Sequence, residues 1–461
     1  MSGLPVAGLL VRLVGMKRLF LLVVALFALH AANAESVAFV NVNVIPMTTE
    51  TVVTGQTVVV DNGIIAAIGD VDGVPVPKAA KIVDGTDRFL IPGLAEMHAH
   101  VPDPGTQFLD RVLTLFVANG VTTIRGMLGR PSHLTLRKRL LDDERFGPRL
   151  ITSGPSMNGR SVDGPADASR KVRAQHAAGY DFIKIHPGLS SEEYESIAIT
   201  SNELGIPFAG HVPVAVGVGN ALSAGTATID HLDGYIASLM PANTDSSGGY
   251  GGFFDVLLAD QVSEDRIAEI AERTAAAGTW NVPTESLFEH RVSDIGVAEL
   301  RNRPEMRYMP AATVQQWVRA KEEQLDERGF NSGIGARAIE LRRKIIVALH
   351  EAGAGLLLGS DAPQVFNVPG FSLHHELGFL VAAGLTPFEA LQTGTTAAAG
   401  FLGTNTGIIA VGREADLVLL NADPLLDIAN TRRIHGVMVR GNWYPSSELQ
   451  ERLSHFREQG D

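Results

Sequence analysis

The stretch Ile91-Pro92-Gly93-Leu94-Ala95-Glu96-Met97-His98-Ala99-His100 is an apolar run that ends in two histidines. On a β-strand, residues i and i+2 point to the same side, so His98 and His100 are expected to project together. Two imidazoles side by side supply half of the ligands that a tetrahedral zinc site needs. The stretch therefore predicts a buried strand that carries part of a metal site.

More candidate ligands follow, each at the end of a later apolar run. They are Lys184, His211, His231 and Asp361, in the segments 181–186, 207–211, 228–231 and 356–361. The sequence contains no cysteine, which excludes disulfides and thiolate ligands. Imidazole and oxygen ligands suit zinc, manganese or iron. In this order, the segments predict one metal centre on top of a barrel.

The region between residues 91 and 402 alternates apolar runs with helical stretches. Besides the runs that carry ligands, strands are expected at 121–125, 149–153 and 279–284, and helices at 169–178, 192–204 and 264–277. Eight strands alternating with helices predict an α/β fold, the (β/α)8 TIM barrel, whose active site lies at the carboxyl ends of the strands. Each ligand candidate falls at such an end.

Two β-rich segments flank this region. Apolar and polar residues alternate between 36 and 90, and a similar pattern recurs between 407 and 441. We expect the two to pair into one small β-sandwich with the barrel inserted between them. The predicted organisation is a first sandwich part at 35–90, the barrel at 91–402, a second sandwich part at 403–445 and a C-terminal tail at 446–461.

The N-terminus is typical of a signal peptide at residues 1–34, with Met16 as a second candidate start. Lys17 and Arg18 precede an apolar run over 19–29, and Ala32-Asn33-Ala34 offers a cleavage site. Because the run is short for a bilayer span, we expect export to a bacterial periplasm or the medium, with no membrane span after cleavage. A membrane anchor is the alternative.

The formal net charge of −13 argues against nucleic acid and anionic membranes as partners. Hydrophobic residues make up 45% of the chain and charged residues 19%, which indicates a globular protein. The expected partner is a small-molecule substrate, and we allow for a homo-oligomer.

The ordered motifs resemble the amidohydrolase superfamily, metal-dependent hydrolases built on a TIM barrel, and within it the Xaa-Pro dipeptidase and imidazolonepropionase-like branch. The motifs are PG-x-x-E-x-H-x-H at 92–100, the strand lysine, the two single histidines and Gly359-Ser360-Asp361. The resemblance covers nearly the whole chain after residue 35. It implies an enzyme that uses metal-activated hydroxide to cleave the amide bond of a dipeptide or an N-acyl amino acid, and the signal peptide predicts that this enzyme is exported.

The resemblance also assigns ligands to two divalent ions, expected to be zinc: a first ion on His98, His100 and Asp361, and a second on His211 and His231. Lys184 would bridge them as a carbamate, because burial and nearby positive charge favour the neutral amine that takes up carbon dioxide. The alternative is that Lys184 pairs with a buried acid. Asp361 would also accept a proton from water and pass it to the leaving amine.

Substrate contacts are assigned to a tyrosine and two arginines. In this branch a tyrosine after the strand-six histidine helps to bind the substrate carboxylate, and Tyr235 holds a comparable place, from which its phenol could also serve an oxyanion. The loop after strand three often carries a Gly-Gly-His element, but residues 157–160 contain no histidine. Arg160 and Arg125 are further candidates for binding a carboxylate.

Other histidines carry weaker arguments. His186 comes two residues after Lys184 and therefore faces the same side of its strand, outside the ligand set. His374 and His375 open a helix after the last strand, where they could reach the rim of the pocket or cap the helix.

Two alternative functions remain open at this stage. A cyclic-amide hydrolase or a mononuclear deaminase of the same superfamily would share the fold, and the deaminase would not need Lys184. A barrel that serves only as a binding scaffold would be expected to lose ligands, whereas all of them are present here.

Overall fold

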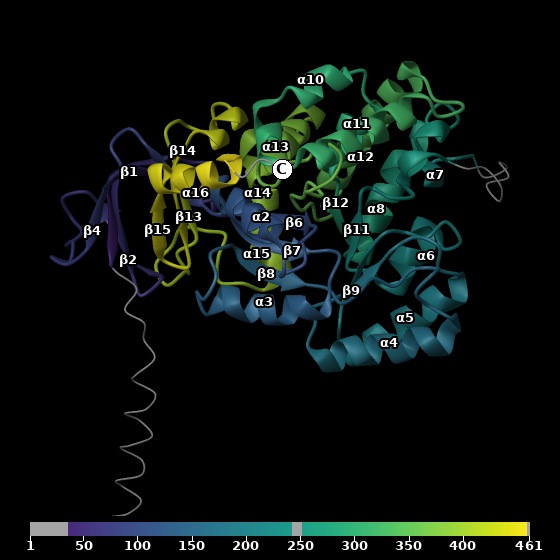
Figure 1. The fold of residues 1–461 in the computed structure, drawn as a ribbon, viewed down its shortest axis with the longest axis horizontal. Coiled ribbons are helices and arrows are strands. Elements are labelled where there is room, and N and C mark those ends of the chain that lie inside the picture. Colours follow the sequence, from purple (N-terminus) through teal and green to yellow (C-terminus); the bar gives the residue numbers. More distant parts are fainter. Residues whose placement is uncertain (1–35, 242–250, 459–461) are drawn as a thin grey trace, which may run out of the picture.

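The computed structural model describes residues 36–241 and 251–458. It consists of a β-rich unit, built from both ends of the chain, and a parallel α/β unit between them (Figure 1). The predicted signal peptide at 1–34 lies outside the described residues. The predicted tail at 446–461 is largely a helix, α16 (Ser446–Glu458), which packs against α2 (Gln107–Ala118).

The parallel strands form two sheets. One contains β6 (Leu94–Ala99), β7 (Val121–Gly126) and β8 (Arg149–Thr152). The other contains β9 (Ile183–Ile185), β10 (Phe208–Gly210), β11 (Thr228–Asp230) and β12 (Trp280–Val282). Single parallel bridges join the sheets, at Ser153–Phe182 and Met157–Ile185 on one side and at Asn281–Leu356 and Ala99–Ala362 on the other. This pairing follows the strand order of a TIM barrel.

The expected eighth strand, at 356–361, is not a regular strand, which corrects the prediction. The backbone N–H of Leu357 donates to Asn281 of β12, but two later N–H groups find other partners: Leu358 donates to the carbonyl oxygen of Thr393, and Ser360 donates to the Glu96 carboxylate. The segment thus joins its neighbours through single bridges, while its end is held by side chains near the candidate ligands.

The helices between the strands follow the local signals of the sequence. Helix α5 (Ser191–Leu204) begins at a capping box, in which Ser190 and Glu193 satisfy each other's backbone N–H groups. It ends at Gly205, whose φ of 69° is the left-handed conformation that glycine adopts readily. Helices α4 (Gly164–Ala178) and α8 (Ile267–Ala277) confirm the other two helices predicted above.

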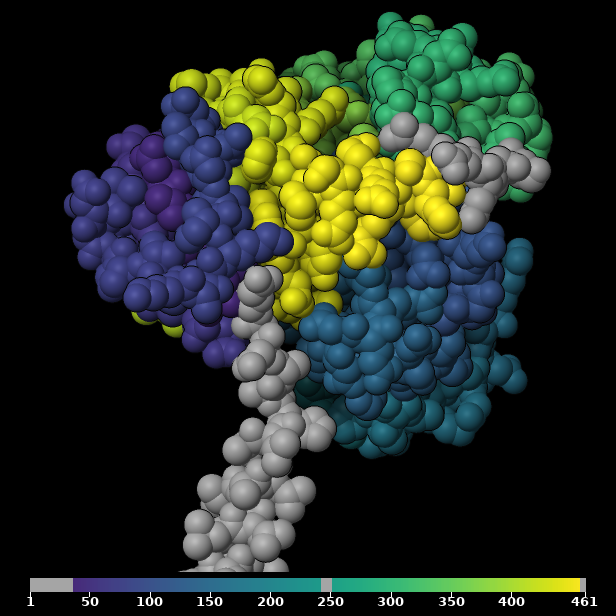
Figure 2. All heavy atoms as spheres, turned by 60° about the vertical axis from the view of Figure 1, so that its left-hand side comes forward, coloured from purple at the N-terminus to yellow at the C-terminus, as the bar shows by residue number. Residues whose placement is uncertain are grey.

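The β-rich unit is one sheet of eight strands rather than the two sheets of a sandwich. Its strands are β1 (Val37–Val44), β2 (Val53–Asp61), β3 (Ile64–Asp70), β4 (Lys81–Asp84), β5 (Phe89–Pro92), β13 (Leu417–Leu420), β14 (Ile434–Val439) and β15 (Asn442–Pro445). Antiparallel pairing of β5 with β13 brings the two ends of the chain together, as predicted. Figure 2 shows the N-terminal segment, in purple, packed against the C-terminal one, in yellow.

This sheet curls over its own core. The order β15-β14-β13-β5-β1 separates β15 from β1, yet the rings of Phe39 on β1 and Trp443 on β15 lie 5.1 Å apart. Both belong to a buried cluster with Leu417 and Met438. The sheet continues into the barrel at Gly93, where a Cβ would lie 2.2 Å from the hydroxyl oxygen of Thr122, so only glycine fits.

The long insertion after β12 is helical and packed. It contains α9 (Glu285–Val292), α10 (Val297–Arg301) and α11 (Ala311–Leu325), and Trp317 of α11 packs with Tyr308 and Phe366 in a buried cluster. Within the described ranges, no helix is both long and apolar enough to cross a membrane.

Candidate metal centre

The two histidines of β6 meet an aspartate. Asp361 Oδ1 lies 2.8 Å from His100 Nε2 and 3.4 Å from His98 Nε2. One ligand atom from each of these residues lies within 4.8 Å of the others, and no other trio of His, Asp or Glu in the described part of the chain is so closely grouped. The structure thus brings together the residues predicted to hold the first ion.

Glu96, the acidic residue of the motif at 92–100, holds the backbone on both sides of this group in place. Its carboxylate accepts the backbone N–H groups of His98, at 2.9 Å, and Ser360, at 2.8 Å, and also the Ser360 hydroxyl. Burial raises the pKa of Glu96 to about 8, against the opposing effect of these hydrogen bonds. Glu96 therefore ties the end of β6 to the segment that carries Asp361.

Lys184 lies at the centre of the site, on β9, fully buried. Its amine forms an ion pair with Asp230 Oδ2 at 3.6 Å, which is the pairing with a buried acid given above as the alternative, but it has no hydrogen-bond partner among the described residues. A Cβ on Gly210 would come within 3.0 Å of Lys184 Nζ, so the glycine leaves room for the amine. Burial lowers the pKa of Lys184, which favours the neutral amine that can take up carbon dioxide.

The two single histidines lie beside the first group. His211 Nδ1 is 3.0 Å from Asp233 Oδ2, His231 Nδ1 is 2.9 Å from Thr284 Oγ1, and the two rings lie 4.6 Å apart. Each ring is thus oriented through one nitrogen and keeps the other for a ligand, as in protein metal sites. Burial, with His98 and His211 nearby, holds the pKa of His231 well below its usual value, so His231 is the neutral imidazole that a metal requires.

Two of these residues adopt an unusual backbone conformation. His231 has φ of 65° and Asp361 has φ of 62°, in the left-handed region that is costly for residues other than glycine. Such conformations persist where the surroundings enforce them, and they cluster at functional sites. Arg342 supplies part of that support, because its buried guanidinium donates to the carbonyl oxygens of His231 and Pro283 and to the carboxylate of Glu285.

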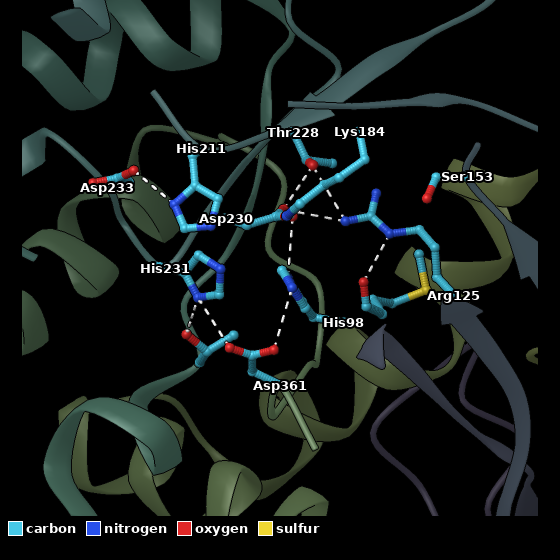
Figure 3. Close-up of polar contacts among 12 residues, drawn as sticks. His98, Arg125, Ser153, Lys184, His211, Thr228, Asp230, His231, Asp233 and Asp361 are labelled. Atoms are coloured by element: carbon cyan, nitrogen blue, oxygen red, sulfur yellow. Dashed lines mark hydrogen bonds and ion pairs between the residues drawn. The ribbon is translucent and has the colours of Figure 1, made fainter. Parts of the chain in front are cut away.

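A buried aspartate that the sequence analysis did not single out, Asp230, contacts both His98 and Lys184. Asp230 Oδ2 lies 3.1 Å from His98 Nδ1, and its Oδ1 accepts hydrogen bonds from Arg125, at 3.1 Å, and Thr228, at 2.7 Å (Figure 3). The sequence could have identified Asp230, because it comes two residues after Thr228 and therefore points to the same side of β11. His231 joins that same side only through its left-handed backbone.

The prediction that Arg125 binds substrate is wrong. Arg125 is only 1% exposed and lies inside the barrel, where its Nε donates to the carbonyl oxygen of Met97 at 2.7 Å. Its guanidinium packs against the rings of Phe182 and Phe401 and pairs with Asp230. The long side chain thus turns into the barrel interior, where its charge balances that of Asp230.

Replacing Asp230 by asparagine is expected to weaken metal binding by about 10–100-fold, the usual effect of removing a residue that orients a metal ligand. The amide would keep the shape but lose the charge that faces Arg125, His98 and Lys184. Chelator competition would measure the affinity. An affinity equal to that of the wild type, in a protein of equal thermal stability, would show that Asp230 does not orient the ligands.

Tyr235 does not reach the site, which corrects a second prediction. Its phenol is buried, donates to Asn281 Oδ1 at 2.8 Å and lies 3.0 Å from Thr274 Oγ1 of α8. Trp280 and Val282, the neighbours of Asn281 on β12, pack inside the barrel, so Asn281 points to the helix layer. Tyr235 begins α7 (Tyr235–Ser238) and turns outward to that layer.

For Tyr235→Phe we therefore expect lower stability and unchanged kcat/KM on substrates with a carboxylate. Removal of the hydroxyl leaves Asn281 Oδ1 buried without its partner, which costs about 1–3 kcal/mol. Urea unfolding and steady-state kinetics would measure the two effects. A ten-fold fall in kcat/KM with unchanged stability would instead return Tyr235 to the substrate site.

Arg160 remains a candidate for substrate binding. It is exposed on the loop after β8, and its backbone N–H donates to Asn158 Oδ1 at 2.9 Å. Met157 of the same loop pairs with Ile185 of β9. Arg160 is thus carried by a loop that runs beside the end of the strand bearing Lys184.

Two aromatic rings contact the histidines of the second group. The ring of Phe254 stacks on that of His231 at 4.8 Å, and the ring of His186 stacks on that of His211 at 5.0 Å. Sequence reasoning could not place Phe254, because it reaches the site from the short helix η2 (Phe253–Leu258) rather than from a strand end.

The histidines that open α13 (Phe371–Ala383) play a structural part. His374 Nδ1 lies 2.9 Å from Thr431 Oγ1, and its Nε2 lies 3.1 Å from the carbonyl oxygen of Asn119. His375 Nε2 lies 3.5 Å from Glu305. These contacts connect α13 to neighbouring segments and not to the candidate ligands.

Comparison with solved structures shows the same architecture elsewhere. Bottromycin amidohydrolase superposes with a TM-score of 0.69 at 23% identity, over 92% of both chains. A Bifidobacterium longum protein described as a candidate prolidase gives 0.67 at 23% identity, over 92% of this chain and 99% of that one. A Xaa-Pro dipeptidase with bound methionine gives 0.63 at 18% identity, over 89% and 100%. These likenesses indicate a TIM-barrel-like fold with an added sheet domain.

Similarity to curated proteins is confined to short segments. A dihydroorotase of Trichlorobacter lovleyi is 33% identical over 70 residues, which span 14% of this chain and 16% of that protein. A dihydroorotase of Mycobacterium tuberculosis is 35% identical over 57 residues, spanning 12% and 13%. This chain therefore spans less than a fifth of the length of these curated relatives.

The match to a family model is much longer. The model of the Amidohydrolase family covers residues 89–444, from the strand that leads into β6 to the last strand of the curled sheet. That range contains every candidate ligand described above. The chain therefore belongs to the Amidohydrolase family.

Proposed function

We propose that this protein is an exported, binuclear amidohydrolase that cleaves the amide bond of a dipeptide or an N-acyl amino acid. The observation that carries the proposal is the fully buried amine of Lys184, which lies among the candidate ligands (Figure 3) and makes no hydrogen bond to a described residue. The predicted signal peptide supports export, and the likeness to a Xaa-Pro dipeptidase agrees with a dipeptide substrate.

The residues fit two divalent cations. Lys184 Nζ and Asp361 Oδ1 are buried and make ion-pair contacts, but neither has a hydrogen bond within residues 36–241 and 251–458. Buried polar atoms without hydrogen bonds are costly, and a cation would satisfy both the oxygen and a carbamate on the lysine. His98, His100 and Asp361 would hold one ion, His211 and His231 the other, and carboxylated Lys184 would bridge. Imidazole and carboxylate ligands suit zinc.

Bound divalent ions would lower the pKa of water and polarise the scissile carbonyl. The chain supplies the proton transfers through Asp361, whose carboxylate lies where the ligand groups meet. Burial alone would raise the pKa of Asp361, but the neighbouring His98 and His100 hold it below its usual value. Asp361 is thus ionised at neutral pH and can take the proton from the attacking water and then give it to the leaving amine.

The residues around this centre suit a substrate with one apolar and one anionic part. The ring of Phe254 lies over His231 and offers an apolar wall, while Arg160 offers a cation on the loop after β8. A guanidinium binds a carboxylate through two parallel hydrogen bonds. An amino-acid derivative with a free carboxylate and an apolar side chain matches both groups.

A substrate library tests the proposal. It would contain dipeptides, N-acyl amino acids and cyclic amides, and released amine or ring opening would be measured after addition of zinc and bicarbonate. We expect turnover of linear amides that carry a free carboxylate. Turnover of cyclic amides alone would favour the alternative to which the short dihydroorotase matches point, and release of ammonia without amide cleavage would favour a deaminase.

A further inference from the structure

His186 is the first residue beyond β9, and its side chain points into the site. Ile183 and Ile185 pack in the main hydrophobic core, so Lys184 and His186 face the opposite side of the chain. The backbone N–H of His186 donates to the carbonyl oxygen of Met157 at 2.9 Å, which fixes the residue between the end of β9 and the loop after β8. His186 thus stands at the carboxyl end of the strand that carries the candidate bridging lysine.

The ring of His186 lies against a candidate metal ligand. It stacks on the ring of His211, with centroids 5.0 Å apart and planes inclined by 29°. The residue is half-buried, so part of it remains accessible to solvent. This places an imidazole at the edge of the second group of ligands.

His186 differs from the other histidines of the site in its polar contacts. His98 and His100 lie beside Asp361, His211 beside Asp233, and His231 beside Thr284. In the described part of the chain, neither a carboxylate nor a hydroxyl contacts His186, and its buried Nδ1 has no hydrogen bond. A histidine that ligates a metal is usually oriented by such a partner. His186 therefore fits a different task.

We propose that His186 is a further catalytic residue, whose imidazole N–H donates a hydrogen bond to the carbonyl oxygen of the scissile amide and to the negative charge that develops on it. The inference rests on the proposed amide hydrolysis. A neutral imidazole suffices, because the hydrogen bond strengthens as the charge grows and no proton is transferred. Stacking on His211 orients the ring, and the backbone hydrogen bond to Met157 fixes the main chain, so little reorganisation is needed during the reaction.

Two substitutions separate the hydrogen bond from the packing. His186→Phe keeps a ring that can stack on His211 but has no N–H, whereas His186→Gln keeps an N–H donor on a side chain of similar reach. We expect His186→Phe to lower kcat/KM by about 100–1000-fold, the usual effect of removing one oxyanion donor, and His186→Gln to recover part of the loss. Metal content and thermal stability are expected to match the wild type.

Inhibitor binding distinguishes loss of the hydrogen bond from a packing defect, because a packing defect would weaken binding of different ligands alike. A phosphonate analogue of the substrate presents a tetrahedral anion, so its affinity for His186→Phe is expected to fall by the same factor as kcat/KM. The product amino acid, which has no such group, is expected to bind unchanged.

The remaining outcomes would overturn either this inference or the proposed function. Loss of bound metal in His186→Phe would make His186 a ligand and overturn the inference, and so would unchanged kcat/KM. A parallel loss of affinity for phosphonate and product would assign a general packing role and also overturn it. Wild-type protein that hydrolyses no linear amide would overturn the proposed function itself, whereas an active wild type with unaffected variants would overturn this inference alone.

Discussion

Lys184→Ala is expected to lower kcat/KM by about a thousand-fold, because one metal ion contributes several kcal/mol of charge stabilisation in the transition state. The variant should also bind one divalent ion per chain instead of two. Lys184 is the proposed bridge between the two groups of ligands. Its amine makes no hydrogen bond to a described residue, and the Asp230 carboxylate that it contacts at 3.6 Å keeps Arg125 as a partner in the variant. Steady-state kinetics and metal analysis of the same sample would measure both effects.

Lys321 offers a matched control, because it is also fully buried. Its amine donates to the carbonyl oxygens of His290 and Ser293, at 2.8 and 2.9 Å. Lys321→Met is therefore expected to lower stability while metal content stays at the wild-type value. Near-wild-type activity of Lys184→Ala would contradict the binuclear proposal and favour a mononuclear site.

Asp361→Asn is expected to lower kcat by at least about a thousand-fold, since general acid–base catalysis contributes about 10²–10⁴-fold and the substitution also weakens a ligand. The loss should be smaller for an anilide with an acidified amine, because that leaving group needs less help from a proton donor. Comparing the two substrates separates proton transfer from metal binding.

The control for this variant is Asp416→Asn in the curled sheet. Asp416 is 3% exposed and accepts the backbone N–H of Arg440 at 2.6 Å, so it is a buried aspartate with a structural partner. We expect it to change stability but not kcat. If Asp361→Asn kept half of the wild-type kcat with full metal content, Asp361 would not be the proton carrier.

The ligand groups could be predicted from the sequence because strand alternation fixes them. His98 and His100 share one side of their segment, and Lys184 lies between Ile183 and Ile185, whose side chains face the core. The strand ends then bring distant segments to one face, as the barrel requires. Local periodicity and a known strand order thus predicted the centre of the site.

The flanking residues could not be predicted in the same way. Tyr235 and Arg125 were assigned by chain position, but sequence distance does not say to which side a short helix or a long side chain turns. Asp230 was overlooked because strict alternation allows only one of Asp230 and His231 to point inward. The left-handed backbone of His231 lets both do so, and that conformation depends on tertiary contacts such as those of Arg342.

The number of sheets in the β-rich unit could not be predicted either, because it depends on contacts between distant parts of the chain. The alternation of apolar and polar residues at both ends of the chain indicated strands, and the pairing of the two ends was predicted. Whether they form two sheets or one depends on the pairing of β5 with β13, more than 300 residues apart in the chain. No local signal specifies that pairing, because it follows from how the barrel brings the two ends together.

The stoichiometry of metal binding, measured with activity, tests the binuclear proposal most directly. Metal-free protein would be titrated with zinc in bicarbonate buffer, and bound metal and hydrolysis of a linear amide would be recorded at each step. We predict saturation at two ions per chain, with most of the activity appearing as the second site fills. Saturation of both binding and activity at one ion per chain would contradict the proposal.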